Sequence, residues 1–419
     1  MGKENKSMGE KLRKNILPIL IVSFSGAIIY GLPYFRFDYY DTYLDMYHLT
    51  NKQMGYFGSI YGVFGMVSYL FGGYVADKIS VRKLISASLI GTGIGGFIHL
   101  LPLNFTMLVL LYAFWGVTSL FAFWPSCVKA VRMMADSSDQ GKAFGIFEGG
   151  RGVSSALVTT LAVLVFTMGS RKIGGAYGVR ALIIFYAVSC VITGILVLIF
   201  MKDGTMESED KMKFSDIGKV LRLPAVWLIS LVTLATYTYT MSFYYFTPYS
   251  TSFLGASVTL GAVIASARRY ISPVSNVGGG FLADKFGTTN LLFISFLVMV
   301  GSIVGMLALP QEKGMIGMFI ALYIISFFFY NINYALGWAM MEEGNIPLSY
   351  SGTAAGVIST IGYLPEVFTP ILAGNLIDNN DGSVTGYRYF YGVVIVVLLL
   401  GACLVLYWKR HLKKSQTNA

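Results

Sequence analysis

The sequence predicts an all-α membrane protein of twelve transmembrane helices, arranged as two six-helix bundles. Three observations support this prediction: the composition, the regular spacing of apolar segments, and a motif that occurs twice. Hydrophobic residues make up 55% of the 419 residues and charged residues only 12%. A soluble domain carries about 25% charged residues, so most of this chain is expected to lie in lipid.

Apolar segments of around 20 residues recur along the chain, and each is long enough to cross a bilayer core of about 30 Å. We expect helices at roughly residues 16–40, 53–76, 84–103, 106–131, 143–168, 180–201, 224–249, 256–281, 290–309, 315–340, 351–377 and 387–408. The 47 glycines allow such helices to approach closely. The three cysteines fall inside these segments and are expected to pack there without forming disulfides.

The net charge of +10 follows membrane topology and does not indicate nucleic-acid binding. With both termini placed in the cytoplasm, most lysines and arginines fall in the inner segments. The outer loops hold only Lys52, Arg171, Lys172, Arg180, Lys313 and Arg388. This positive-inside pattern predicts cytoplasmic N- and C-termini. The polar start of the chain also argues against a cleaved signal peptide.

A polar stretch of mixed charge divides the chain into related halves. We predict an N-terminal bundle at 1–201, a cytoplasmic linker at 202–222 and a C-terminal bundle at 223–419. The sequence GYVADKISVRK at 73–83 is partly repeated as GFLADKFG at 280–287. The repeat offset is 207 residues (284 minus 77), about half the chain. Such a repeat is typical of transporters with parallel halves around a midplane site.

The motif at 73–83 resembles the loop signature of the major facilitator superfamily, and 280–287 resembles its second occurrence. The resemblance implies the major facilitator fold and transport by alternating access. It also implies gating roles for four loop residues, Asp77, Lys78, Arg82 and Asp284. Ser80 stands where that family usually has glycine, and the second copy lacks the terminal basic pair.

Ionisable side chains also fall inside the apolar segments. They are Arg36, Asp38, Lys129, Glu148, Arg151, Arg268, Arg269 and Glu366. Each costs roughly 2.5–3.5 kcal/mol to insert on insertion scales, so each is expected to be functional or paired. Glu148 and Arg151, three residues apart, are expected to form a structural pair on one helix face. The remaining basic surplus favours an anionic substrate, because guanidinium groups match carboxylate, sulfonate and phosphate oxygens.

Several of these positions have two open interpretations. Arg36 either snorkels to the outer interface beside Asp38 or contacts substrate. One of Arg268 and Arg269, which point about 100° apart on a helix, is expected to face the substrate and the other a partner helix. Glu366 either carries a proton or pairs with an arginine, which leaves anion exchange and proton symport both open.

A second resemblance concerns the segment Trp124 to Lys129, which reads W-P-x-C-x-K. It resembles the organophosphate:phosphate antiporters. That resemblance implies that Lys129 borders the substrate pathway and that Arg36 contacts the anion. The seventh segment departs from that family, because it carries tyrosines, Tyr245 among them, and lacks an arginine.

Two further resemblances are local. The pair Arg268–Arg269 is similar to the eighth-helix arginine of the oxalate:formate antiporter, in a different register. Residues 48–55, 140–152 and 362–365 resemble the YihN-like bacterial permeases.

We therefore predict a secondary active transporter in the bacterial cytoplasmic membrane that moves a small organic anion by antiport or proton symport. Tyr245, Asn333 and Tyr363 are further candidates for substrate contact. The alternative is a neutral or zwitterionic solute such as a sugar, peptide or drug, with the buried charges serving structure and proton coupling. No metal-spaced cluster or phosphate-binding loop occurs in the sequence, so we expect no enzyme and no cofactor. We also expect no nucleic-acid partner, and a monomer in the lipid bilayer.

Overall fold

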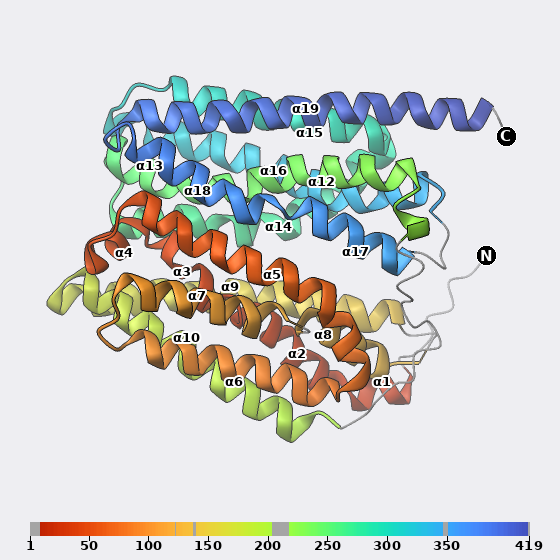
Figure 1. The fold of residues 1–419 in the computed structure, drawn as a ribbon, viewed down its shortest axis with the longest axis horizontal. Coiled ribbons are helices and arrows are strands. Elements are labelled where there is room, and N and C mark those ends of the chain that lie inside the picture. Colours follow the sequence, from red (N-terminus) through yellow and green to blue (C-terminus); the bar gives the residue numbers. More distant parts are fainter. Residues whose placement is uncertain (1–8, 122, 137–139, 203–217, 347–350, 418–419) are drawn as a thin grey trace. The chain divides into compact units, whose positions relative to one another are not determined.

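The computed structural model describes residues 9–121, 123–136, 140–202, 218–346 and 351–417, and every element in these ranges is a helix (Figure 1). Nine helical segments of the described residues are long and apolar enough to cross a membrane. They become ten if the pair Ile16–Ile28 (α2) and Gly31–Asp38 (α3), bent by 45°, is one span. The predicted all-α membrane fold is confirmed. The count of twelve and the cytoplasmic termini stay predictions.

The chain packs as two compact units. Unit 1 comprises Met1–Phe35 and Val67–Glu209, and unit 2 comprises Arg36–Met66 and Asp210–Ala419. Helix α3 and the long helix α5 (Asn51–Lys78) each contribute residues to both units. The predicted linker 202–222 lies largely outside the described residues, so the boundaries 1–201 and 223–419 stay predictions.

Unit 1 contains the helices of the first half apart from α4 and the parts of α3 and α5 that belong to unit 2. Besides α2 they are α1 (Glu10–Lys14), α6 (Val81–His99), α7 (Phe105–Leu120), α8 (Phe123–Met133), α9 (Gln140–Ile173) and α10 (Gly175–Phe200). The described helices wholly within unit 2 are α4 (Tyr40–Tyr47), α12 (Pro224–Ser242), the 3₁₀ turn η2 (Phe243–Tyr245), α13 (Phe246–Phe253), α14 (Val258–Phe286), α15 (Thr288–Ala308), η3 (Lys313–Met315), α16 (Ile316–Glu343), α17 (Ser351–Gly362), α18 (Pro365–Asp378) and α19 (Val384–Thr417).

Four of the helices predicted as continuous are interrupted, and a proline follows each interruption. The prolines are Pro33, Pro125, Pro248 and Pro365. Because proline has no N–H, the carbonyl four residues earlier loses its helical hydrogen bond. The interruptions fall near those carbonyls, between α2 and α3, α7 and α8, α12 and α13, and α17 and α18 (Figure 1). Hydropathy alone does not register this loss, which is why the apolar pattern predicts unbroken helices.

Glycines let α6 and α10 approach closely in unit 1. A Cβ at Gly93 would lie 2.8 Å from the Ala187 carbonyl oxygen, and one at Gly96 would lie 2.7 Å from the Ala187 Cβ. Ser86 of α6 donates a hydrogen bond of 2.8 Å to the Gly194 carbonyl of α10. The helices therefore pack with little side-chain volume between them, as expected for membrane helices that lack a hydrophobic driving force.

Aromatic side chains fill the core of unit 2 around the break between α12 and α13. Phe246 and Tyr391 stack with ring centroids 4.6 Å apart. The Tyr391 hydroxyl donates to the Ser242 carbonyl at 3.1 Å, one of the backbone oxygens next to the 3₁₀ turn. A hydrogen-bonded, packed break of this kind holds the residues of η2 in fixed positions.

Candidate substrate site

The 3₁₀ turn η2 places Phe243 and Tyr244 against a buried arginine of α14. The Cζ atom of Arg268 lies 4.5 Å from the Phe243 ring centroid and 4.8 Å from that of Tyr244. Nη2 of Arg268 is 3.8 Å from Oδ1 of Asp38, and the two side chains are only 11% and 6% exposed. Arg268 is thus held by two aromatic faces and one carboxylate.

A second arginine lies against the same aromatic group. Arg36 of α3 is 1% exposed, and its Cζ is 4.2 Å from the Phe37 ring centroid. Phe37 in turn stacks on Tyr244 at 4.1 Å with an interplanar angle of 22°. The two guanidinium groups therefore each contact one ring of a single stack. The structure places Arg36 in a buried site and not at an exposed interface position.

Glu366 belongs to a hydroxyl-rich part of unit 2. It is 6% exposed, and the Tyr237 hydroxyl donates to its Oε2 at 3.2 Å. The Tyr237 ring packs against Tyr363 at 4.5 Å, and the Tyr363 and Tyr334 hydroxyls are 3.0 Å apart. Glu366 and Tyr237 thus form one hydrogen-bonded pair and Tyr363 and Tyr334 another, and the Tyr237–Tyr363 ring contact joins the two pairs.

Two buried amides lie on α16. Asn333 is fully buried, and its Oδ1 accepts a hydrogen bond of 3.3 Å from Thr236. Within the described residues its Nδ2 has no hydrogen-bond partner. Asn331 accepts from Ser272 at 2.7 Å and donates to the Phe327 carbonyl at 3.0 Å. Asn333 is therefore the amide with a donor left over.

Tyr245, the last residue of η2, contacts several candidate elements. Its hydroxyl donates to the Pro370 carbonyl at 3.3 Å. Its ring lies 6.3 Å from Phe37 and 5.8 Å from Tyr40. Tyr245 thus packs between α18 and the segment that carries Arg36.

Three other candidates lie in unit 1. Glu148 and Arg151 form an ion pair on α9, with Nε and Nη2 of Arg151 donating to Glu148 Oε2 at 3.0 and 2.5 Å. The Arg151 guanidinium also lies over the Trp124 ring at 5.0 Å. Lys129 is half-buried on α8.

The predicted gating residues lie where the sequence pattern puts them, at the junction of α5 and α6 and near the end of α14. The side chains of Asp77, Lys78 and Asp284, and that of Arg269, are outside the described side chains. Ser80 has a structural role, since its hydroxyl accepts a hydrogen bond of 3.5 Å from the Lys83 amide at the start of α6.

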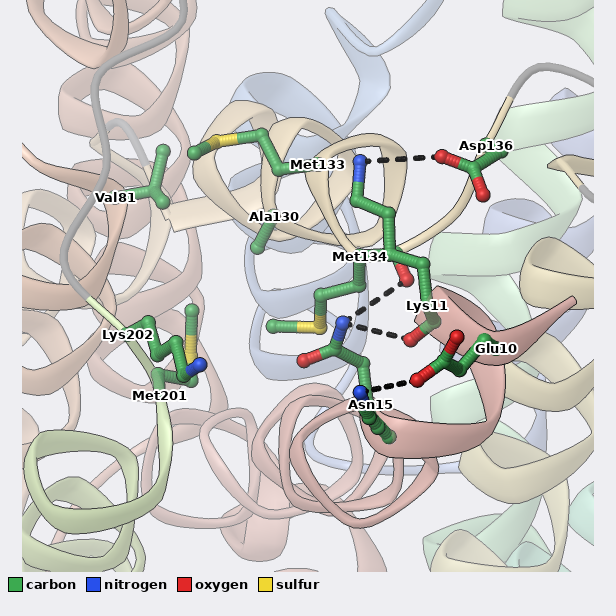
Figure 2. A pocket seen from close by; sticks show the side chains of 11 residues that line it. Glu10, Lys11, Asn15, Val81, Ala130, Met133, Met134, Asp136, Met201 and Lys202 are labelled. Carbon is green, nitrogen blue, oxygen red and sulfur yellow. Dashed lines mark hydrogen bonds and ion pairs between the residues drawn. The ribbon is translucent and has the colours of Figure 1, made fainter.

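A cavity of about 590 Å³ in unit 1 contains none of the candidate substrate residues. Figure 2 shows Lys11 reaching Asp136, at 3.6 Å, and Asn15 donating to the Met134 carbonyl at 3.3 Å. Lys14 pairs with Glu10 in the same cavity. These contacts join α1 to the end of α8. Two of the three lysines that line the cavity are paired with carboxylates, and Lys202 is the third.

Sequence reasoning missed the aromatic partners of the two arginines. Phe37 and Phe243 were not predicted as site residues, and Tyr237 was not linked to Glu366. The runs Arg36-Phe37-Asp38 and Phe243-Tyr244-Tyr245 are the available signals, since aromatic residues next to intramembrane charges can screen them. No group of three or more metal-ligating side chains occurs among the described residues.

Comparisons with known proteins place the chain among membrane transporters. It is 30% identical to the inner membrane protein YqcE of Escherichia coli, over 92% of this chain and 94% of YqcE. It is 28% identical to the inner membrane protein YihN of the same organism, over 91% and 92% of the two chains. Both relatives are inner membrane proteins, and the apolar helices of this chain make it a multi-pass membrane protein as well.

The fold also matches a solved structure. A bacterial homolog of the human lysosomal transporter Spinster, in an inward-facing and unoccupied conformation, superposes with a TM-score of 0.78. It is 16% identical, and the match covers 97% of this chain and 98% of that one. A family model for the major facilitator superfamily matches residues 16–370. The chain is therefore a transporter, not an enzyme, and it belongs to the major facilitator superfamily.

Proposed function

We propose that this transporter moves a small organic anion (a phosphate ester, sulfonate or carboxylate) by secondary active transport with alternating access. The observation that carries the proposal is the pair of buried guanidinium groups, Arg36 and Arg268, held on the Phe37–Tyr244 stack. A buried arginine is costly in a membrane protein and usually marks a substrate pathway or a paired site. Its planar fork of donors matches the oxygens of these anions.

The charge balance of the site supports two transport modes. Arg36 and Arg268 are balanced by Asp38 and Glu366, so the described cluster is neutral when all four groups are ionised. An incoming anion then either replaces Asp38 beside Arg268 or enters together with a proton on Glu366. The first mode suits anion exchange and the second suits proton symport. The 3.8 Å separation of Arg268 and Asp38 is longer than a hydrogen bond, which favours a partner that can be exchanged.

The polar groups near Glu366 suit a hydroxylated substrate body. The Tyr237, Tyr363 and Tyr334 hydroxyls and the buried Nδ2 of Asn333 are donors or acceptors within unit 2. A buried donor without a partner costs about 1–3 kcal/mol, and a substrate oxygen would relieve that cost. We therefore extend the proposal to an anion with a polar body.

A neutral or zwitterionic solute is the second candidate, and the same charge balance favours it. If Asp38 serves only Arg268 and the charge of Glu366 balances that of Arg36, no net charge is left for an anion. In that case Tyr237 and Asn333 would do most of the recognition.

The test is thermal stabilisation of the purified protein by phosphate esters, sulfonates, carboxylates, neutral sugars and cationic solutes. We expect at least one class of anion to stabilise the wild type, and Arg36→Lys and Arg268→Lys to reduce that effect. Arg180→Lys is the matched control, since Arg180 is exposed on α10. Stabilisation by neutral or cationic ligands alone would reject the anion proposal.

A second measurement separates the two modes. Uptake of the stabilising anion into liposomes is followed with internal counter-anion and, separately, with an inward proton gradient. Acceleration by the counter-anion indicates exchange, and acceleration by the gradient indicates symport. Uptake that never saturates would contradict alternating access itself.

A further inference from the structure

The first part of α5 packs in unit 2, against α18. Three glycines on one face of α5 make this possible: Gly55, Gly58 and Gly62, spaced three and four residues apart. A Cβ at Gly55 would lie 2.4 Å from the Pro370 carbonyl oxygen, and one at Gly58 would lie 2.8 Å from the Pro370 Cβ. The two helices therefore meet closely, and on the α5 side no side chain of these three residues lies in the contact.

A carboxylate closes this contact at the N-terminal end of α5. Asp378, the last residue of α18, accepts hydrogen bonds from the Asn51 side-chain Nδ2 at 2.8 Å, the Asn51 amide at 3.2 Å and the Lys52 amide at 2.6 Å. The first amides of a helix have no partner within the helix, and a negative charge is favoured there. Asp378 supplies that charge from a residue 327 positions away.

Helix α5 already has a local cap, so Asp378 is not needed to start it. Thr50 Oγ1 accepts from the Gln53 amide at 3.2 Å, and Gln53 Oε1 accepts from the Thr50 amide at 3.0 Å. This reciprocal pair is a capping box. The bonds to Asp378 come in addition to it, so their main effect is to join α5 to α18.

Two further contacts hold the same segment. The Tyr40 hydroxyl donates to Asn51 Oδ1 at 2.8 Å, which turns the Asn51 Nδ2 toward Asp378. The Thr251 hydroxyl of α13 donates to Asp41 of α4. Residues 36–66, which belong to the first half of the sequence, are thus hydrogen-bonded to the second half at two separate points, Asp378 and Thr251.

We propose that the hydrogen bonds from Asn51 and Lys52 to Asp378 hold a gate closed at the N-terminal end of α5 in this structure, and that they break once in each transport cycle. We call this group of bonds the latch. The inference rests on the family's transport function and not on the nature of the substrate. Helix α5 is about 42 Å long from its 28 residues, and the 73–83 loop lies at its other end. Alternating access moves one half of such a transporter against the other, so the bonds from Asn51 and Lys52 to Asp378 must break when this end opens.

The chemistry of the latch suits repeated opening. Its donors are two backbone amides and one side-chain amide, and its acceptor is a carboxylate, all of which water can solvate when they separate. Such a contact stabilises the closed state, and its loss leaves no unsolvated polar group in the open state. This is the energy balance that a two-state element requires.

Hydrogen–deuterium exchange of the full chain in nanodiscs tests the latch. We compare the wild type with Asp378→Asn and with Asp381→Asn, a matched control in the exposed turn three residues later. Hydrogen bonds to a charged group are strong enough that their loss should speed opening about tenfold or more. Asp378→Asn should therefore speed exchange across residues 40–57 and 246–253 together, and Asp381→Asn should not.

A purely structural cap would respond differently. Faster exchange confined to the amides of Asn51 and Lys52, or no change at all, would overturn the proposal. If Asp378→Asn does not fold, Asn51→Asp replaces it, because it sets a second carboxylate beside Asp378 and keeps the capping box. Combining Asn51→Asp with Asp378→Asn should slow exchange again, and a double variant as fast as Asn51→Asp would also overturn the latch.

Discussion

Two arginine–carboxylate pairs in this protein consist of the same kinds of side chain but differ in burial. Arg268 and Asp38 in unit 2 are 11% and 6% exposed, whereas Arg151 and Glu148 in unit 1 are 38% and 46% exposed. Each arginine lies over an aromatic ring, Phe243 at 4.5 Å and Trp124 at 5.0 Å. The buried pair joins two distant segments, and the exposed pair joins residues three apart on one helix.

The difference shows that a short distance between nitrogen and oxygen is a poor guide to how much an ion pair contributes to stability. Arg151 and Glu148 have the shorter contacts, at 2.5 and 3.0 Å, yet a pair that water can reach contributes only about 0–1 kcal/mol. Arg268 and Asp38 are farther apart, yet losing one partner of a buried pair costs about 3–5 kcal/mol because the other charge stays buried. Burial and reach across the fold are therefore the two properties on which the proposed role of Arg268 and Asp38 rests.

Truncation of Arg268 should have the largest effect, and truncation of Arg151 is its comparison. We expect Arg268→Ala to lower the free energy of unfolding by about 3–5 kcal/mol and to abolish stabilisation by anions. Arg151→Ala should cost about 1 kcal/mol or less. Thermal unfolding in detergent, with and without the stabilising anion, measures both effects. Equal losses in the two variants would remove the distinction between the pairs.

Neutralising the carboxylates sharpens the comparison. Asp38→Asn leaves Arg268 without this counter-charge, so the anion-free protein should lose several kcal/mol, and added anion should restore more stability than it adds to the wild type. Glu148→Gln should change neither value by more than about 1 kcal/mol. An anion response that is lost in Asp38→Asn would mean that Asp38 does not compete with the anion for Arg268.

Glycine substitutions test the packing behind Arg36. A Cβ at Gly58 would meet Pro370 at 2.8 Å and Arg36 Nη2 at 3.4 Å, whereas nothing lies within 4 Å of one at Gly152 on α9. We expect Gly58→Ala to cost about 1–3 kcal/mol through overpacking. Gly152→Ala should gain up to about 1 kcal/mol from helix propensity. Thermal unfolding of the two variants beside the wild type measures whether Gly58→Ala lowers stability while Gly152→Ala raises it.

Asp41 should give the smallest effect, a pH dependence. Burial raises the pKa of its carboxyl group, the hydrogen bond from Thr251 lowers it, and the charge of Asp45 raises it, with a raised pKa as the net result. The packed state therefore binds the proton more tightly than a state in which Asp41 is exposed with its ordinary pKa of 3.8. Protonation removes the cost of burying a charged carboxylate. The stability of the protein should therefore rise as the pH falls from 7 toward 3.8.

The check is the difference in melting temperature between wild type and Asp41→Asn across this pH range. The difference should depend on pH, and the same comparison with Asp381→Asn should not. If the wild type loses stability relative to Asp41→Asn on acidification, the pH dependence has the opposite sign and contradicts the prediction.

The sequence predicts the class of fold well because hydropathy and charge are local properties. The lengths of the apolar segments and the repeated loop lead directly to a helical transporter. The helix breaks near Pro33, Pro125, Pro248 and Pro365 were open to prediction from the lost backbone hydrogen bond, but hydropathy does not detect it.

The candidate site could be predicted only in part. The cost of a charge at membrane depth points to Arg36, Asp38 and Arg268 one at a time. Their meeting around Phe37 and Tyr244 depends on three segments that are far apart in the sequence, and no local pattern contains it. The same holds for Asp378, which is an unremarkable helix-terminal residue until its contact with α5 is seen.

The central claim is that the buried arginine pair recognises an anion, and proteoliposome uptake of the anion that most stabilises the wild type tests it most directly. Arg268→Lys keeps the charge but loses the planar fork, and Arg151→Lys makes the same change in the exposed pair. We predict that Arg268→Lys lowers the initial rate about tenfold or more, the equivalent of one charged hydrogen bond. Arg151→Lys should stay within about twofold of the wild type. Wild-type uptake by Arg268→Lys, or an equal loss in both variants, would contradict the claim.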